Sequence, residues 1–200
     1  MSFVYGILLA AGESRRMGYP KPLLKIDGET FVAHTAMTML SVLARLAVVV
    51  GAHADRVRPA IPTDPRINIV ENPEWSRGQL SSTKAGLRSL PADASAAMIH
   101  LIDHPTVKAE TFAAVLEAYR QSGKPIVIAR HDGRRGHPVL FDRSLFAELL
   151  DAPEDQGARV VVNAEPSRVV YTDVSDPGIL LDLDTPEELI RAGFVYPDRF

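Results

Sequence analysis

Residues 6–25 read GILLAAGESRRMGYPKPLLK and carry the clearest structural signal in the chain. The apolar run up to Ala10 is typical of a central parallel strand covered on both faces, so we expect a buried strand over residues 3–10. Small residues and then a polar loop with Arg16 and Lys21 follow this strand. A strand that leads into small residues and cations presents backbone N–H groups and positive charge to phosphates. The stretch therefore predicts a nucleotide site.

The chain beyond this stretch alternates between apolar runs and segments of helical periodicity. Predicted strands cover residues 46–51, 66–70, 96–102, 125–129, 139–141 and, at a sheet edge, 168–172; predicted helices cover residues 29–43, 53–61, 81–89, 108–121, 143–150 and 156–163. Short connections between them favour an α/β fold: a three-layer α/β/α sandwich with a mostly parallel, Rossmann-like sheet. Ligands of such sheets bind beyond the carboxyl ends of the strands, where we expect Gly12 and Asp103.

Two local patterns make more detailed predictions. The periodicity of the first helix predicts one apolar side formed by Phe31, His34, Met37 and Leu40. Residues 131–138, HDGRRGHP, are expected to form a polar, glycine-rich loop.

The C-terminal region carries a helix start signal. Thr185 is expected to be the N-cap and Pro186 the first helical residue. No repeat or linker interrupts the sequence, so we expect one domain over residues 1–200. Its nucleotide-binding half is expected at about residues 1–105 and its acceptor-binding half at about 106–200.

Composition excludes several classes of protein. The 200 residues carry a net charge of −3, which argues against a general nucleic-acid binder. The chain has no cysteine, so disulfides and thiolate chemistry are excluded and a metal must use oxygen or imidazole ligands. Because no apolar run approaches the length of a membrane span, we expect no membrane segment and a soluble, cytoplasmic protein.

The loop after the first strand lacks both common nucleotide signatures. It is neither a GxGxxG fingerprint nor a Walker loop, because no Gly-Lys-Ser/Thr follows. Its cations nevertheless suit a triphosphate: Arg16 can hold terminal phosphates in a fork, and Lys21 can place charge on the α-phosphate. The alternative is a surface loop with ordinary solvated cations.

Acidic residues follow two apolar runs. Asp103 ends a predicted strand, where a carboxylate can hold Mg²⁺, although it could instead cap the next turn. Asp182 and Asp184 follow the run ILL and, two apart on an extended segment, point the same way. Capping of the next helix is the alternative for this pair, and Glu187 and Glu188 could already serve that purpose.

A glycine and three hydroxyls open a predicted helix at residues 78–83, GQLSST. They can donate hydrogen bonds to a ribose, base or phosphate, or simply cap the helix without a ligand. Among the six histidines no pair has zinc spacing on one helix face, and His34 and His100 are expected to be packed. His137 could contact a substrate phosphate, and His104 could face the pocket beside Asp103.

Six motifs occur in one order over about residues 4–190: LAAGESRRMGYPKPLL, WSRGQLSSTKAGL, LIDHPTV, GHPVLF, DQGAR and DLDTPEEL. In the content and order of these motifs, the chain resembles the nucleotidyltransferases that include the molybdenum cofactor cytidylyltransferases and guanylyltransferases. The cytidylyltransferase branch is the more similar one. It carries Ala-Ala-Gly where guanylyltransferases usually carry Ala-Gly-Gly, and it shares the Gly-His-Pro and Asp-x-Asp-Thr-Pro segments.

The resemblance implies a fold of the nucleotide-diphospho-sugar transferase type and a role for each motif. The implied roles are nucleotide wrapping for Leu9, Ala10, Ala11 and Gly12; phosphate binding for Arg16 and Lys21; base and ribose contacts for Gly78 and Ser82; Mg²⁺ ligation for Asp103 and Asp184; and acceptor contacts for Gly136, His137 and Pro138. One departure lies beside the implied metal ligand, where relatives usually read Asp-Gln-Pro or Asp-Met-Pro and this chain reads Asp-His-Pro.

The expected activity is Mg²⁺-dependent transfer of CMP from CTP to the phosphate of molybdopterin cofactor, with release of pyrophosphate. A molybdoenzyme that receives the cofactor is a further expected partner. Another phosphorylated acceptor, such as a sugar or polyol phosphate, and a non-catalytic cofactor-delivery protein remain as alternatives. A Rossmann oxidoreductase is disfavoured because GxGxxG is missing.

Overall fold

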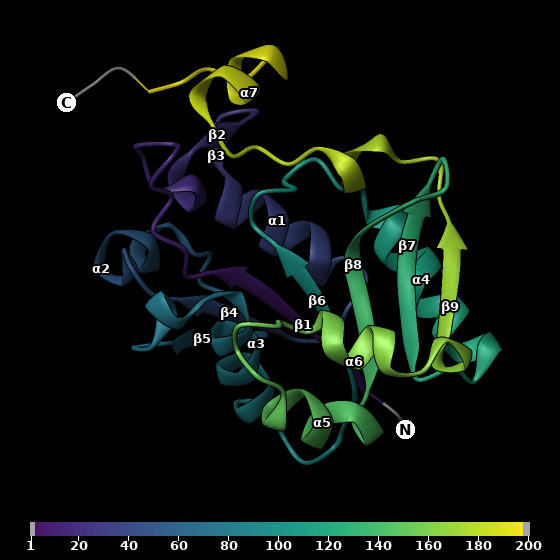
Figure 1. The fold of residues 1–200 in the computed structure, drawn as a ribbon. Helices are drawn as coiled ribbons and strands as arrows, with labels where there is room; N and C mark the ends of the chain where they lie inside the picture. Colours follow the sequence, from purple (N-terminus) through teal and green to yellow (C-terminus); the bar gives the residue numbers. More distant parts are fainter. Residues whose placement is uncertain (1–2, 198–200) are drawn as a thin grey trace.

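A computed structural model describes residues 3–197. Seven strands form one mixed sheet in the order β5-β4-β1-β6-β8-β7-β9 (Figure 1). The strands are β1 (Phe3–Ala10), β4 (Leu46–Val50), β5 (Ile67–Glu71), β6 (Ala94–Leu101), β7 (Ile126–His131), β8 (Arg134–Asp142) and β9 (Val169–Asp173). β8 pairs antiparallel with both of its neighbours, and the other pairings in this sheet are parallel. The predicted mostly parallel α/β sheet is confirmed.

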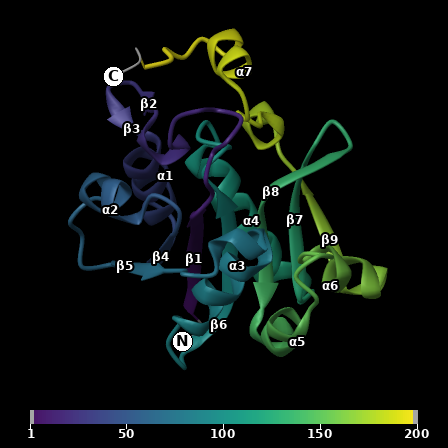
Figure 2. The same cartoon turned by 60° about the vertical axis from the view of Figure 1, so that its left-hand side comes forward.

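Helices cover both faces of the sheet, which gives the three predicted layers (Figure 1, Figure 2). The α-helices of residues 3–197 are α1 (Phe31–Leu40), α2 (Ala54–Val57), α3 (Gln79–Arg88), α4 (Ala109–Ser122), α5 (Phe146–Asp151), α6 (Arg159–Ala164) and α7 (Pro186–Arg191), of which α7 lies beyond the end of the sheet (Figure 1). Alternate residues of β1 enter two different cores, as the two-residue period of a strand requires. Leu8 packs with α1 and α4, whereas Ile7 and Leu9 pack with α3 and α5.

The first helix is shorter than predicted and faces the core differently. Thr30 caps it by accepting a 3.3 Å hydrogen bond from the N–H of Ala33, and residues before it pair in a small hairpin, β2 (Lys25–Ile26) with β3 (Glu29–Thr30). Met37 was predicted on the apolar side and is instead 42% exposed. The fully buried side carries Phe31, Val32, Ala36 and Met39. The prediction was wrong because the three-residue spacing it followed drifts off a helix that turns every 3.6 residues.

The predicted loop over residues 131–138 is also wrong. Only Asp132 and Gly133 turn, both with positive φ (47° and 76°), and Arg134 already begins β8. The predicted strand 139–141 is therefore the second half of a longer strand. Gly136, His137 and Pro138 lie on this strand, not on a loop.

The remaining predicted elements are found with shifts of a few residues. The predicted helix 143–150 is a 3₁₀ turn followed by α5, and the predicted helix 156–163 begins only at Arg159. The predicted cap of α7 is confirmed: Thr185 and Glu188 form a reciprocal capping box, with Pro186 as the first helical residue. Within residues 3–197, every helix is too short or too polar to cross a bilayer.

The register of the sheet brings several segments to one edge. Ala10 pairs with Val50, and Leu9 pairs with Leu101, so the carboxyl ends of β1, β4 and β6 lie together. β8 runs the opposite way, and its pairing of Val139 with Ile99 places the residues just before Val139 at the same edge. The candidate residues of both halves of the chain therefore meet beyond the ends of the parallel strands.

Candidate active site

The loop after β1 is folded back on itself by short-range hydrogen bonds. Ser14, with φ of +56°, accepts a 3.1 Å hydrogen bond at Oγ from the N–H of Lys21, and its carbonyl accepts one of 3.0 Å from the N–H of Gly18. The His53 ring is 3.0 Å from the carbonyl of Glu13 and supports the loop from β4. A Cβ added at Gly12 would have no heavy atom within 4 Å, so the space beside this residue is open to a ligand.

A cavity of about 440 Å³ lies over this loop, and we name it the nucleotide cavity after the ligand that the sequence predicts for this loop. Nine of the residues predicted at the site line it: Leu9, Ala11, Gly12, Arg16, Lys21, Gly78, Ser82, Asp103 and Asp184. Ala10 was predicted with them but does not line the cavity, because its side chain is buried on the opposite face of β1. Trp75, the only tryptophan, also lines the cavity.

A second, larger cavity of about 920 Å³ adjoins the first, and we name it the acceptor cavity after the ligand predicted for residues 136–138. Its walls include apolar side chains of β6, β7 and β8, and Gly136 and His137 line it while Pro138 is buried beneath. Arg135 and Arg159 line it as well, two cations that the sequence did not single out. Five residues line both cavities: Arg16, Gln79, Leu101, Asp103 and Asp184.

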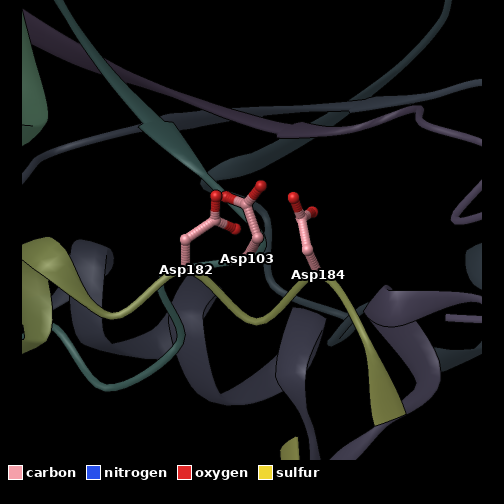
Figure 3. Close-up of side chains that lie close together, drawn as sticks. All are labelled: Asp103, Asp182 and Asp184. Carbon is pink, nitrogen blue, oxygen red and sulfur yellow. The ribbon is translucent and has the colours of Figure 1, made fainter. Parts of the chain in front are cut away.

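Three carboxylates converge where the two cavities meet (Figure 3). Asp103 follows β6, and Asp182 and Asp184 come from the extended segment before α7. One oxygen of each carboxylate lies within 4.8 Å of an oxygen of the other two. Asp103 Oδ1 is buried and accepts no hydrogen bond from residues 3–197. An oxygen-only ligand set with a buried, unsatisfied carboxylate oxygen fits a hard divalent cation such as Mg²⁺ or Mn²⁺.

Two cations from the loop contact this cluster. Lys21 Nζ lies 2.5 Å from Asp184 Oδ1 and 3.6 Å from Asp103 Oδ2, and Arg16 forms an ion pair with Asp184. Burial alone would raise the pKa of Asp184, but the hydrogen bonds and charges of Lys21 and Arg16 outweigh it and lower that pKa. Within residues 3–197 Asp182 forms no ion pair; burial together with the charges of Asp103 and Asp184 raises its pKa, and the charges of Lys21 and His104 offset this only in part. The cluster therefore has an excess of negative charge on the side of Asp182.

The start of α3 is held by a residue that sequence reasoning missed. The Asn72 side chain is buried after β5 and donates hydrogen bonds of 2.9 and 3.0 Å to the hydroxyls of Ser81 and Ser82. Gly78, directly before α3, has a φ of 106° that side chains rarely tolerate, and no heavy atom lies near its missing Cβ. The helix start is thus fixed from one side and open toward the nucleotide cavity. An asparagine directly after an apolar strand was the only available signal for Asn72.

Three histidines pack together beside Asp103. The ring centroids of His104 and His137 lie 5.7 Å apart in a stacked arrangement, and His100 lies 6.3 Å from His104. Burial, and then the neighbouring His104, lower the pKa of His137 to about 4. Burial also lowers the pKa of His100, which is packed as predicted. His34, also predicted as packed, is half-buried.

Fold and site together define the class of protein. A phosphate-type loop after the first strand, a carboxylate cluster and two adjoining cavities at the carboxyl edge of an α/β sheet are the features of a nucleotidyltransferase. The sequence model of the MobA-like NTP transferase domain matches residues 6–169, and the chain belongs to this family.

Relatives in this family differ in the nucleotide they are named for. Molybdenum cofactor cytidylyltransferase of Escherichia coli (strain K12) is 26% identical over 192 residues, which are 96% of each chain. A protein of Bacillus anthracis (strain CDC 684 / NRRL 3495), named "Probable molybdenum cofactor guanylyltransferase", is 33% identical over an alignment of 201 positions that covers 96% of each chain.

A solved structure supports both the fold and the metal chemistry of the family. Rv0371c of Mycobacterium tuberculosis H37Rv superimposes with a TM-score of 0.80 at 27% identity, covering 96% of this chain and 97% of that one. The same protein has also been solved in complex with manganese, which matches this chain with a TM-score of 0.73 at 25% identity over 95% and 97% of the two chains. A relative thus binds a divalent metal, and this chain has an acidic cluster suited to one.

Proposed function

We propose that this chain transfers CMP from CTP to the phosphate of molybdopterin cofactor in a Mg²⁺-dependent reaction that releases pyrophosphate. The observation that carries the proposal is the convergence of Asp103, Asp182 and Asp184 with Lys21 and Arg16 between the two cavities. Opposite charges gathered at one point between two binding spaces suit a reaction in which phosphates from both sides must meet.

The nucleotide is proposed to bind in the N-terminal half, about residues 1–105. The backbone from Leu9 to Gly12 wraps it, with Ala10 contributing only main-chain atoms because its side chain is in the core. Gly78 and Ser82 contact the base and ribose at the open start of α3. The backbone N–H groups at this helix start and in the loop after β1 supply partial positive charge to the phosphates.

Asp103 and Asp184 are the proposed Mg²⁺ ligands, with Asp182 as a third carboxylate within reach. The unsatisfied Oδ1 of Asp103 supports the assignment, because a buried carboxylate oxygen without a donor is costly unless a cation meets it. A Mg²⁺ ion held by these carboxylates would supply positive charge against the negative charge that develops on the phosphates.

The reaction needs placement and charge from the protein, and no base. An oxygen of the acceptor phosphate forms a bond to the α-phosphorus, while the bond from that phosphorus to the oxygen of pyrophosphate breaks. The acceptor phosphate is already ionised at neutral pH, so no proton has to be removed from it. When the nucleotide binds, Lys21 places its charge on the α-phosphate and Arg16 holds the terminal phosphates with its forked guanidinium group. Both side chains then exchange their ion pairs with Asp184 for contacts with the phosphates.

The acceptor is proposed to bind in the C-terminal half, about residues 106–200, against Gly136, His137 and Pro138. A volume of about 920 Å³ is far more than a bare phosphate requires, so the acceptor has a body that fills it. Apolar strand residues suit a planar or apolar body, and Arg135 and Arg159 suit polar or anionic groups at its far end. A molybdoenzyme that receives the finished cofactor is the proposed downstream partner.

The choice of CTP over GTP is supported by Ala11. Its side chain is 4% exposed and lines the nucleotide cavity, at the position where guanylyltransferases usually carry glycine. A methyl group there narrows the space and favours the smaller pyrimidine base. Ala11→Gly should therefore improve turnover with GTP relative to CTP.

The test is pyrophosphate release from CTP, GTP, UTP and ATP, each with Mg²⁺ and either molybdopterin cofactor, a sugar phosphate or a polyol phosphate. The proposal expects turnover that is fastest with CTP and the molybdopterin cofactor. Faster use of GTP contradicts the choice of base, and faster use of a sugar or polyol phosphate contradicts the acceptor. Tight cofactor binding without pyrophosphate release with any nucleotide would support a delivery protein instead.

A further inference from the structure

His104 lies between the two segments that supply the carboxylate cluster. It directly follows Asp103, and its ring is buried. Its Nδ1–H donates a 3.0 Å hydrogen bond to the carbonyl of Leu181, the residue before Asp182. The two partners are 77 positions apart in the sequence, so this bond joins distant segments at the site.

A backbone hydrogen bond acts beside it. The N–H of Leu183 donates to the carbonyl of Asp103 at 3.1 Å. The two bonds are therefore made on either side of Asp182, one at Leu181 and one at Leu183. The Leu183 side chain is fully buried, and because side chains alternate on extended backbone, Asp182 and Asp184 are turned together toward Asp103 (Figure 3).

The orientation of the His104 ring is itself fixed by its neighbours. The carbonyl of His104 accepts a 3.1 Å hydrogen bond from Nε2–H of His100, which holds the loop after β6 from beneath. The ring of His104 stacks on that of His137, with 29° between their planes. The other ring nitrogen of His104, Nε2, lies 3.8 Å from Asp103 Oδ1.

We propose that His104 is a positioning residue: its bond to Leu181 holds residues 181–184 against the loop after β6 and so assembles the three carboxylates into one divalent-cation site. The inference rests on the proposed function only in treating these carboxylates as a metal site. Hydrogen bonds behind metal ligands commonly control metal affinity, because they determine whether the ligands are arranged before the ion binds.

The test compares two substitutions of nearly equal shape. His104→Asn keeps an N–H donor close to the position of Nδ1, whereas His104→Leu keeps the volume of that side chain and loses the donor. Affinity for Mn²⁺ alone is measured by electron paramagnetic resonance of the free ion, and folding is checked by thermal unfolding. We expect His104→Leu to weaken Mn²⁺ binding by about tenfold or more, and His104→Asn to remain within about threefold of the wild type.

A matched control exists on the same segment. His131 also donates from Nδ1 to a backbone carbonyl, that of Val174, at 2.8 Å, but eight residues before Asp182. His131→Leu removes the same kind of bond at the start of the segment and is expected to leave Mn²⁺ affinity unchanged. Turnover of His104→Leu should recover as Mg²⁺ is raised, which a general loss of structure would not allow.

Two results would overturn the inference: wild-type Mn²⁺ affinity in His104→Leu, or an Asn variant that folds normally and binds as weakly as the Leu variant. If His104→Leu does not fold, His104→Met, which also lacks the donor, takes its place: weaker Mn²⁺ binding by the Met variant than by His104→Asn supports the role, and equal affinities contradict it. Absence of Mn²⁺ binding by the wild type would instead contradict the metal site of the proposed function.

Discussion

The nucleotide cavity and the acceptor cavity adjoin each other but are built differently. The nucleotide cavity is formed by the ends of parallel strands, a helix start and the loop after β1, and it presents backbone and charge. The acceptor cavity is about twice as large, and antiparallel β8 contributes its floor with Gly136, His137 and apolar side chains. The nucleotide cavity is suited to recognise a ligand through its phosphate groups, and the acceptor cavity is suited to recognise a ligand through the shape of its non-phosphate part.

This difference indicates that substrate specificity lies in the two cavities and that the reaction takes place at the junction between them. The residues that line both cavities include Asp103, Asp184 and Arg16, so the residues proposed to act on the phosphates belong to neither cavity alone. We therefore expect changes at the junction to abolish transfer, and changes in one cavity to affect one substrate. The largest effects are expected at the junction, and smaller effects are expected at residues that line only one cavity.

The largest effect is expected at Asp103. Asp103→Asn removes the buried negative charge for the metal but keeps the side-chain volume, and turnover should fall by about a thousandfold because phosphate charge is no longer neutralised. Pyrophosphate release measures it, and Asp151→Asn at an exposed position at the end of α5 is the control. Turnover within a few-fold of the wild type would mean that Asp103 does not hold the metal.

Lys21→Met tests a residue of the nucleotide cavity alone. It lines that cavity but not the other, so kcat should fall by about a hundredfold while the KM for the acceptor changes little. Lys25→Met, on the exposed strand β2, is the matched control. A rise in the KM for the acceptor as large as the fall in kcat would contradict the assignment of Lys21 to the nucleotide cavity alone.

One glycine in each cavity can be replaced by alanine, and the two substitutions are expected to change the free energy of unfolding by different amounts. A Cβ at Gly136 would lie 2.2 Å from the carbonyl oxygen of Ile179, so Gly136→Ala should lower the free energy of unfolding by about 1–3 kcal/mol. A Cβ at Gly12 meets open space, so Gly12→Ala should change stability by less than about 0.5 kcal/mol and raise the KM for the nucleotide. Urea unfolding distinguishes them, and equal stabilities would contradict this difference in packing.

The smallest effect is a pH dependence from the acceptor side. His137 has a pKa of about 4 in the folded protein against 6.5 ordinarily, so between these values the unfolded chain binds the proton and the folded chain does not. The free energy of unfolding should therefore decrease as pH falls from 6.5 toward 4. His137→Asn should make this decrease shallower in urea unfolding at several pH values. Part of the pH dependence remains in the variant because the pKa of His100 is also lowered. An identical dependence of the unfolding free energy on pH in the wild type and in His137→Asn would contradict the lowered pKa of His137.

The sequence predicted what local signals determine. Continuous apolar runs identified the parallel strands, and Thr185-Pro186 identified the start of α7. Carboxyl ends of parallel strands meet at one edge, so Asp103 and the loop of Lys21 could be placed together before the structure was known.

What the sequence could not predict depends on contacts between distant segments. Arg134 and Gly136 look like loop residues, and only the pairing of β8 with β7, which begins with Arg134 opposite His131, makes them part of a strand. The family resemblance favours Asp184, directly before Thr-Pro, over Asp182, whereas tertiary packing brings both carboxylates close to Asp103. The bond from His104 to Leu181 has no local signature at all.

The central claim is that one divalent ion joins the two cavities at the carboxylate cluster. Crystals grown with Mn²⁺ and the α,β-methylene analogue of CTP, which cannot release pyrophosphate, allow a direct test by anomalous scattering. We predict an anomalous peak about 2 Å from carboxylate oxygens of Asp103 and Asp184, in contact with the phosphates of the analogue. A nucleotide bound in the nucleotide cavity with no ion at these carboxylates, or an ion bound elsewhere, would contradict it.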